Sequence, residues 1–375
     1  MIPFIGEYIR EKFNIDPIFI LLESRQIRQA ELSTISFLVK KKEKDREDPF
    51  AIIKMPRYAD NIQALRTLEL ENENLTILSK KLSQELLSSV PSILFFDKIS
   101  DAYVLGERFI AGLEMSSAIL KGPSILDNFA ANSIAASSWL SEFEDSFEKR
   151  PTGSHQITES LSNDLSSKLS QTNYRLLNKA LKILSAEPDR QMAIVPQHGD
   201  FHASNIFMKN GKIAGVIDWE DFSLVSHPPC YDLVHFIYTY IEALYEAALR
   251  SGSLELTKDL QSSKALQDIA GALFIDRCAG SGNDSSTQAC FILFYLLRSL
   301  AMASDPRKMA QAAASKLLIT ISFAPCTFAE LFSCMAYKNY FLLGSKYRRE
   351  GNEQLAKLCE ERIKEIKDSG SARVL

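Results

Sequence analysis

The sequence predicts an α+β fold with a small β-rich N-terminal part and a larger, mainly helical C-terminal part. Two runs of β-branched and aromatic residues, at 35–39 and 50–55, are typical of strands. After Asp60 the leucines recur with a helical period, and from Leu233 onward the apolar-rich segments have the composition of helices. The chain has 375 residues, which suits two domains at roughly 100–200 residues per domain.

The N-terminal strands are expected as a hairpin followed by a second pair. Ile35–Val39 and Phe50–Met55 form the hairpin, and the charged stretch Lys40–Asp48 between them is expected to be an exposed turn. Two further short strands are expected around 92–96 and 103–109. These segments predict a small sheet before residue 110.

One helix separates the two strand pairs. Its apolar face is marked by leucines at helical spacing, namely Leu65, Leu68, Leu75, Leu78 and Leu82. Glu71 follows Leu68 by three residues, so its side chain lies beside that face. An acidic residue is therefore predicted next to the buried side of this helix.

The remaining segments are mostly helical. Residues 111–190 are expected to form helices with a loop around 150–155, and Tyr231–Leu249 is a long apolar-rich helix. Residues 288–302 have the same character, and Lys338–Asp368 is expected to be one charged amphipathic helix.

Membrane, nucleic-acid and zinc-binding classes receive no support. The uncharged stretch 317–329 contains polar residues and Pro325, so we expect a buried helix pair rather than a membrane span. The net charge is −4, which gives no basic surface for nucleic acid. The 6 cysteines form no C-x-x-C pair and the 5 histidines are scattered. The charged N-terminus has no secretory leader pattern, so we expect a cytoplasmic protein. Nothing in the sequence indicates its oligomeric state.

The stretch 198–218 carries the chemistry. A loop bears Asp200 and Asn205, and a hairpin turn signal, Asn210-Gly211, follows it. Because a hairpin reverses the chain, it folds Asp218 back toward the first two side chains. Two carboxylates and one amide oxygen then converge, and hard oxygen ligands of this kind suit Mg²⁺.

This layout matches the needs of phosphoryl transfer from ATP. That reaction needs a carboxylate to position the attacking hydroxyl, metal-holding groups, and a cation on the phosphates. Asp200 and Asn205 have the D-x-x-x-x-N spacing of a kinase catalytic loop, and Asp218 follows after the hairpin. The spacing therefore favours a kinase-like site.

The segment 198–233 resembles the aminoglycoside phosphotransferase and choline kinase-like family, which consists of small-molecule kinases with a protein-kinase-like fold. The family motif H-G-D-x-x-x-x-N occurs as His198–Asn205, and I-D-W occurs as Ile217–Trp219. The third part, P-x-x-D-L, occurs as Pro229–Leu233. The resemblance implies a bilobal fold, with residues 1–108 as an N-lobe and 109–375 as a C-lobe.

The resemblance also implies roles in the catalytic region, 194–218. Asp200 would be the catalytic residue that takes the hydroxyl proton, while Asn205 and Asp218 would hold Mg²⁺. His198 and Asp232 would support the catalytic loop structurally, although Asp232 alone would be read as a helix N-cap.

In the N-lobe, the resemblance makes Lys54 the phosphate-binding lysine and Glu71 its partner. Glu69 and Glu73 are alternatives for that partner. The adenine of ATP would be read by backbone groups near Glu107 and Phe109.

The loop that would cover the phosphates departs from the family pattern. Residues 22–39 contain no glycine, so Ser33 and Thr34 would supply N–H groups and hydroxyls instead. This departure motivates an alternative function, a non-catalytic kinase-like module that binds nucleotide or regulates a partner.

The favoured function is an ATP- and Mg²⁺-dependent phosphotransferase that acts on a hydroxyl of a small molecule such as a sugar, amino sugar or amino alcohol. A protein kinase is less favoured, because only 13 residues separate Asp218 from Asp232. That length leaves little room for a peptide-binding platform.

Overall fold

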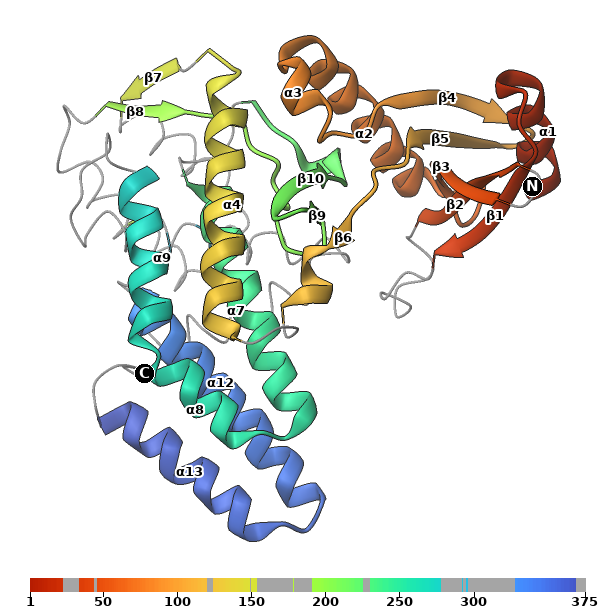
Figure 1. Cartoon of the computed structure of the whole chain (residues 1–375). Helices are drawn as coiled ribbons and strands as arrows, with labels where there is room; N and C mark the ends of the chain where they lie inside the picture. Colours follow the sequence, from red (N-terminus) through yellow and green to blue (C-terminus); the bar gives the residue numbers. More distant parts are fainter. Residues whose placement is uncertain are drawn as a thin grey trace. The chain divides into compact units, whose positions relative to one another are not determined.

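The computed structural model describes residues 1–22, 34–43, 46–119, 124–148, 150–153, 178, 191–224, 230–277, 292, 295 and 328–368. Packing divides the chain into two compact units, and Figure 1 labels their helices and strands. The first unit consists of Met1–Leu113, His198–Asp200 and Asn205–Phe222, and the second consists of Glu114–Gln197, Phe201–Ser204 and Ser223–Leu375. The boundary between proposed domains near residue 108 stays a prediction.

An antiparallel sheet forms most of the first unit, with strand order β1-β2-β3-β5-β4. The strands are β1 (Pro17–Leu22), β2 (Thr34–Glu43), β3 (Arg46–Pro56), β4 (Ile93–Ile99) and β5 (Ala102–Arg108). All four predicted strands are present. The expected turn at 40–48 is wrong in extent, because β2 and β3 continue into it. Lys41 lies opposite Asp48 there, and opposite charges across a strand pair favour continued pairing.

The two faces of this sheet differ in character. Helix α1 (Ile2–Phe13) contributes Ile5 and Ile9 to an apolar core that includes Ile53 of β3. Neighbouring residues of a strand point to opposite faces. Lys54 therefore points away from that core. Glu107 of β5 lies opposite Ile52, which places its side chain on the same face as Lys54.

Helix α2 (Ile62–Lys81) is the predicted leucine-rich helix. Its N-terminus is capped by the side chain of Asn61, which accepts a hydrogen bond from the backbone N–H of Ala64 at 3.0 Å. Four of the five predicted leucines are buried, and Glu71 lies on the same side with only 1% exposure. The short helix α3 (Gln84–Leu87) follows.

The predicted catalytic hairpin is present in the first unit. Strands β9 (Ile206–Lys209) and β10 (Lys212–Val216) pair antiparallel, and the turn between them has φ values of 52° at Asn210 and 74° at Gly211. Positive φ at both positions fits a two-residue hairpin turn. The 3-10 turn η3 (Trp219–Asp221) follows directly after Asp218.

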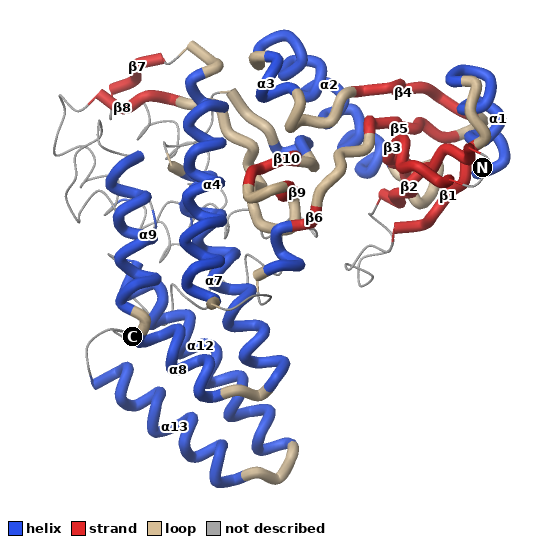
Figure 2. Tube along the Cα trace, in the orientation of Figure 1, coloured by secondary structure: helices blue, strands red, loops and turns tan. Residues whose placement is uncertain are grey.

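The second unit is mainly helical in its described parts (Figure 2). Its elements are η2 (Met115–Ala118), α4 (Ile125–Asp145), β7 (Arg150–Gly153), β8 (Gln191–Ile194), α7 (Tyr231–Ser251), α8 (Leu254–Ser262), α9 (Lys264–Arg277), α12 (Phe328–Arg349) and α13 (Glu353–Asp368), and the two-residue strand β6 (Leu113–Glu114) lies at the boundary between the units. Helix α12 packs against α7, α8 and α13.

Two expectations for the second unit are wrong. The expected loop at 150–155 begins with strand β7, which pairs antiparallel with β8. The expected single helix at 338–368 is two helices, because the chain turns at Gly351, where φ is 74°. A left-handed glycine of this kind commonly ends a helix.

Some expectations fall outside the described residues. These are nearly all of 154–190, nearly all of 288–302 and the greater part of 317–329. In the described ranges, each helix is too short or too polar to cross a bilayer.

Candidate active site in the first unit

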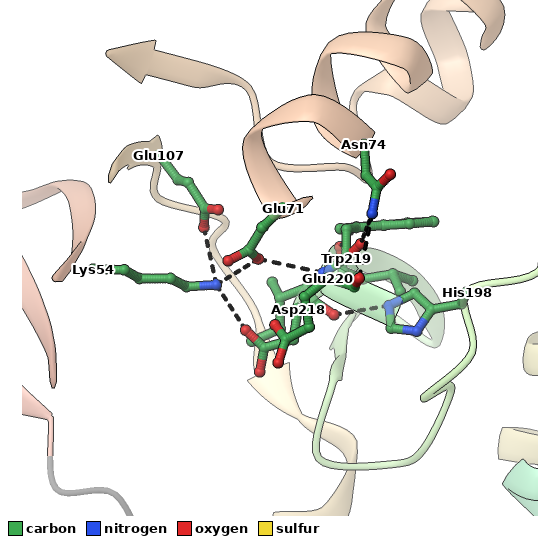
Figure 3. A network of polar contacts seen from close by, with 10 residues as sticks. Lys54, Glu71, Asn74, Glu107, His198, Asp218, Trp219 and Glu220 are labelled. Carbon is green, nitrogen blue, oxygen red and sulfur yellow. Dashed lines mark hydrogen bonds and ion pairs between the residues drawn. The ribbon is translucent and has the colours of Figure 1, made fainter. Parts of the chain in front are cut away.

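The amine of Lys54 lies at the centre of the site (Figure 3). Its Nζ is 2.6 Å from Glu71 Oε1, 2.7 Å from Asp218 Oδ1 and 3.5 Å from Glu107 Oε2. Three separate segments supply these carboxylates: helix α2, the turn after β10 and strand β5. Lys54 itself is buried. The fold therefore gathers one ammonium and three carboxyl groups, of which Glu71 and Glu107 are buried and Asp218 is partly exposed.

This imbalance of charge shifts the pKa of every member. Burial alone would lower the pKa of Lys54, but the surrounding carboxylates raise it well above its usual value. Burial, and then the charge of Glu107, raise the pKa of Glu71 to about 8. Burial also raises the pKa of Glu107, whereas Lys54 overcomes the effect of burial and lowers the pKa of Asp218. One ammonium cannot neutralise three carboxylates, so burial and mutual repulsion raise the pKa values of the two buried acids, Glu71 and Glu107.

Replacing Glu107 by glutamine should flatten the pH dependence of stability. The pKa of Glu71 rises from 4.5 to about 8 on folding, so its contribution to stability is complete below pH 4.5 and is lost as the pH rises through 8. Glutamine removes one cause of that rise. We expect Glu107→Gln to gain more stability, relative to wild type, at pH 8 than at pH 5. Urea unfolding of both proteins at pH 5 and pH 8 measures the free energy of unfolding. A gain of Glu107→Gln over wild type that is the same at the two pH values would contradict the prediction.

Asp218 has an unusual backbone that its neighbours hold in place. Its φ of 64° and ψ of 67° are left-handed, which is uncommon for a residue with a β-carbon. The N–H of Ile217 donates to the carbonyl of Asn205 at 3.0 Å, and the N–H of Trp219 donates to Glu71 Oε1 at 3.3 Å. The peptide group after Asp218 is thus fixed to α2, and the strand end before Asp218 is tied to Asn205.

His198 braces the loop that was predicted to be catalytic. Its Nε2 lies 2.9 Å from the carbonyl of Ile217, and its Nδ1 accepts the N–H of Asp200 at 3.2 Å. This buried ring therefore connects the backbone of Asp200 with the strand end that precedes Asp218. Gly199 between them has a φ of 86°, and a β-carbon there would lie 2.4 Å from the carbonyl oxygen of Asp221. Glycine is the residue that this close packing admits.

Asn205 and Asp218 offer oxygen atoms that suit Mg²⁺. Asn205 donates its Nδ2 to the carbonyl of Asp200 at 3.0 Å, which leaves its Oδ1 as an acceptor. Glu71, Asp218 and Glu220 each have one carboxylate oxygen within 4.8 Å of the others. Burial, and then the charge of Asp218, raise the pKa of Glu220 well above its usual value. A cation among the oxygens of Glu71, Asp218 and Glu220 would relieve their repulsion, and carboxylate oxygens of this kind suit Mg²⁺.

The structure separates Glu71 from its two competitors. Glu69 lies 3.3 Å from Arg66 and Glu73 lies 3.9 Å from the same guanidinium, and all three side chains are exposed. Glu71 is the glutamate of α2 that contacts Lys54.

The remaining residues predicted from the sequence are Ser33, Thr34, Phe109 and Asp232. Thr34 begins β2 opposite Pro56, and Ser33 lies outside the described residues. The N–H of Phe109 donates to the carbonyl of Phe50 at 3.2 Å, which occupies that donor. Asp232 is buried in the first turn of α7 in the second unit, where the N-cap position belongs to Cys230, so the N-cap interpretation is wrong.

Sequence reasoning missed two side chains of this site. Glu107 was expected to contribute its backbone, yet its carboxylate faces Lys54. Asn74 was not singled out at all, although its Nδ2 donates to the carbonyl of Trp219 at 2.7 Å. A signal for Asn74 exists, because a polar residue three positions after Glu71 and four before Leu78 falls on the buried side of α2.

Comparisons with known proteins identify the family and the fold. The phosphotransferase enzyme family matches residues 34–262, which is more than half of the chain. The structure is similar to an aminoglycoside phosphotransferase, APH(4)-Ia, in a ternary complex with AMP-PNP and hygromycin B: identity is 11%, the TM-score is 0.50, and the match covers 83% of this chain and 95% of that one.

A second structural match is the macrolide 2'-phosphotransferase MphH from Brachybacterium faecium, with 10% identity, a TM-score of 0.45, and coverage of 83% of this chain and 96% of that one. The comparison with curated proteins finds no match. The fold is α+β and protein-kinase-like, and the chain belongs to the phosphotransferase enzyme family.

Proposed function

We propose that this protein transfers the γ-phosphate of ATP, with Mg²⁺, to a hydroxyl group of a small molecule. The observation that carries the proposal is the contact of the Lys54 amine with both Glu71 and Asp218, in a chain that belongs to a phosphotransferase family. Phosphoryl transfer needs a positioned cation for the phosphates and carboxylates for metal. Both are held together in the first unit.

Each residue of the site has a proposed role. Lys54, set by Glu71, would bind the phosphates, and Asn205 with Asp218 would hold Mg²⁺, which neutralises the charge of the triphosphate when it is bound. Asp200 would orient the acceptor hydroxyl and take its proton. His198 keeps the backbone of Asp200 in place for this task through its Nδ1.

The acceptor is proposed as a small hydroxylated molecule of the sugar, amino sugar or amino alcohol class. Support comes from family membership and from the similar structure that holds hygromycin B. The proposed lobes are residues 1–108 and 109–375, with the acceptor bound by the helices of the larger lobe.

ATP consumption against a library of hydroxylated metabolites tests the proposal. The control is Asp200→Asn, which keeps the shape of the side chain but removes the base. We expect at least one acceptor to stimulate ATP consumption by wild type and not by the variant. Equal rates for both proteins with every acceptor would contradict the proposal.

A non-catalytic nucleotide-binding module is the second candidate, because residues 22–39 contain no glycine. It predicts that ATP with Mg²⁺ raises the unfolding temperature without any acceptor-dependent consumption. Ligand bound at a hundredfold excess over Kd would stabilise the protein by about 2.7 kcal/mol.

A further inference from the structure

We propose that Asn74 is a positioning residue that fixes the backbone of Asp218 for metal binding. The inference rests on the proposed function, because it gives Asp218 the role of a metal ligand. Asn74 acts through its hydrogen bonds to the main chain of the turn η3.

The contacts of Asn74 are directed at consecutive peptide groups. Its Nδ2 lies 2.7 Å from the carbonyl oxygen of Trp219 and 3.4 Å from that of Glu220 (Figure 3). The side chain is buried, with 8% of the residue exposed. Two carbonyls turned to one side of α2 need a donor there, and an amide NH₂ group supplies two hydrogens.

Glu71 makes the complementary contact one helical turn earlier on α2. Its Oε1 accepts the N–H of Trp219 at 3.3 Å, while Asn74 donates to the carbonyl of the same residue. The peptide groups on both sides of Trp219 are thus clamped by two side chains of one helix. A residue in a left-handed conformation stays there when its surroundings determine it, and Asp218 directly precedes this clamp.

The arrangement couples the phosphate-binding part of the proposed site, Lys54, with its metal-binding part, Asp218. Glu71 holds the amine of Lys54, and the pair of Glu71 and Asn74 holds the turn that carries Asp218. Loss of the Asn74 contact should therefore impair metal-dependent binding of the nucleotide while leaving the Lys54–Glu71 pair in place.

Asn74→Asp is the sharpest test, because aspartate has the same shape but cannot donate when ionised and places its charge against two carbonyl oxygens. The matched control is Asn72→Asp, the same change about 200° around α2. Calorimetric titration with ATP, in Mg²⁺ and separately in EDTA, gives two dissociation constants for each protein. We expect Asn74→Asp to raise the constant in Mg²⁺ about tenfold or more, since an unsatisfied buried acceptor costs more than an average hydrogen bond contributes. The constant in EDTA and both constants of Asn72→Asp should stay at wild-type values.

A second measurement does not depend on nucleotide binding. The chain has 2 tryptophans, so Trp139→Phe leaves Trp219 as the single tryptophan, whose emission is excited selectively over that of tyrosine. Trp219 is fully buried. In that background, Asn74→Asp should increase acrylamide quenching of Trp219, and Asn72→Asp should not.

The outcomes separate the two proposals. If wild type binds no ATP but Asn74→Asp exposes Trp219 to quencher, the proposed function fails and Asn74 still positions the turn. If Asn74→Asp binds Mg²⁺-ATP like wild type and leaves quenching unchanged, the inference about Asn74 is overturned. Should Asn74→Asp not fold, Asn74→Ala, which removes the donor without adding charge, is judged by the same two measurements.

Discussion

Asp218→Asn is expected to abolish the part of ATP binding that depends on Mg²⁺. Asparagine is chosen because Asp218 has a φ of 64°, and asparagine tolerates the left-handed region better than alanine. The change thus removes a charge without altering the turn. Substitutions outside a ligand set lower metal affinity roughly 10–100-fold, and loss of the anionic ligand itself should exceed that range. Titration of ATP in Mg²⁺ measures the effect.

The control for this prediction is Asp200→Asn. Asp200 acts on the acceptor hydroxyl, so its loss should stop turnover and leave Mg²⁺-ATP affinity nearly intact. If Asp218→Asn and wild type bind Mg²⁺-ATP equally well, Asp218 does not hold the metal.

Among the substitutions proposed for this site, Lys54→Met is expected to lower the free energy of unfolding most. Methionine fills a similar volume but leaves the carboxylates of Glu71, Glu107 and Asp218 facing one another without a cation. Removing one partner of a buried ion pair costs about 3–5 kcal/mol. Without the ammonium, the pKa values of Glu71 and Glu107 should rise further above those of the unfolded chain, and the pKa of Asp218 should lose the lowering that Lys54 causes. Stability is then retained at low pH and lost as the pH rises.

Urea unfolding at pH 5 and pH 8 measures this loss, which should be larger at pH 8. The matched control is Lys98→Met, the same substitution at an exposed position of β4 in the same sheet. Phosphate binding should fail as well in Lys54→Met. A small and pH-independent destabilisation, equal to that of Lys98→Met, would mean that Lys54 does not neutralise the buried acids.

The predictable parts of the site are those with local signals. The hairpin around Asn210-Gly211 follows from turn chemistry, and α2 follows from leucines at helical spacing. Glu71 could be placed beside the apolar face of that helix by its spacing from Leu68, whereas its pairing with Lys54 was implied by the family resemblance. In each case a few neighbouring residues contain the information.

The unpredicted parts depend on contacts between distant segments. Glu107 faces Lys54 because β5 pairs with β3 in a particular register, with Glu107 opposite Ile52. Residue spacing does not specify that register. Asn74 bonds to a carbonyl 145 residues away, and any backbone segment offers the same acceptor. Pairing register and main-chain partners are set by the folded chain as a whole, which is why sequence patterns miss them.

The first unit is discontinuous in sequence, and this affects how it can form during synthesis. Residues 1–113 leave the ribosome before 198–222, which complete the unit. At roughly 5–20 residues per second, the delay is about 5–20 s. Throughout that interval Lys54, Glu71 and Glu107 are present without Asp218, and the side of α2 that bears Asn74 has no turn to bind. A nascent chain in this state therefore lacks the turn that covers this side of α2 in the folded protein.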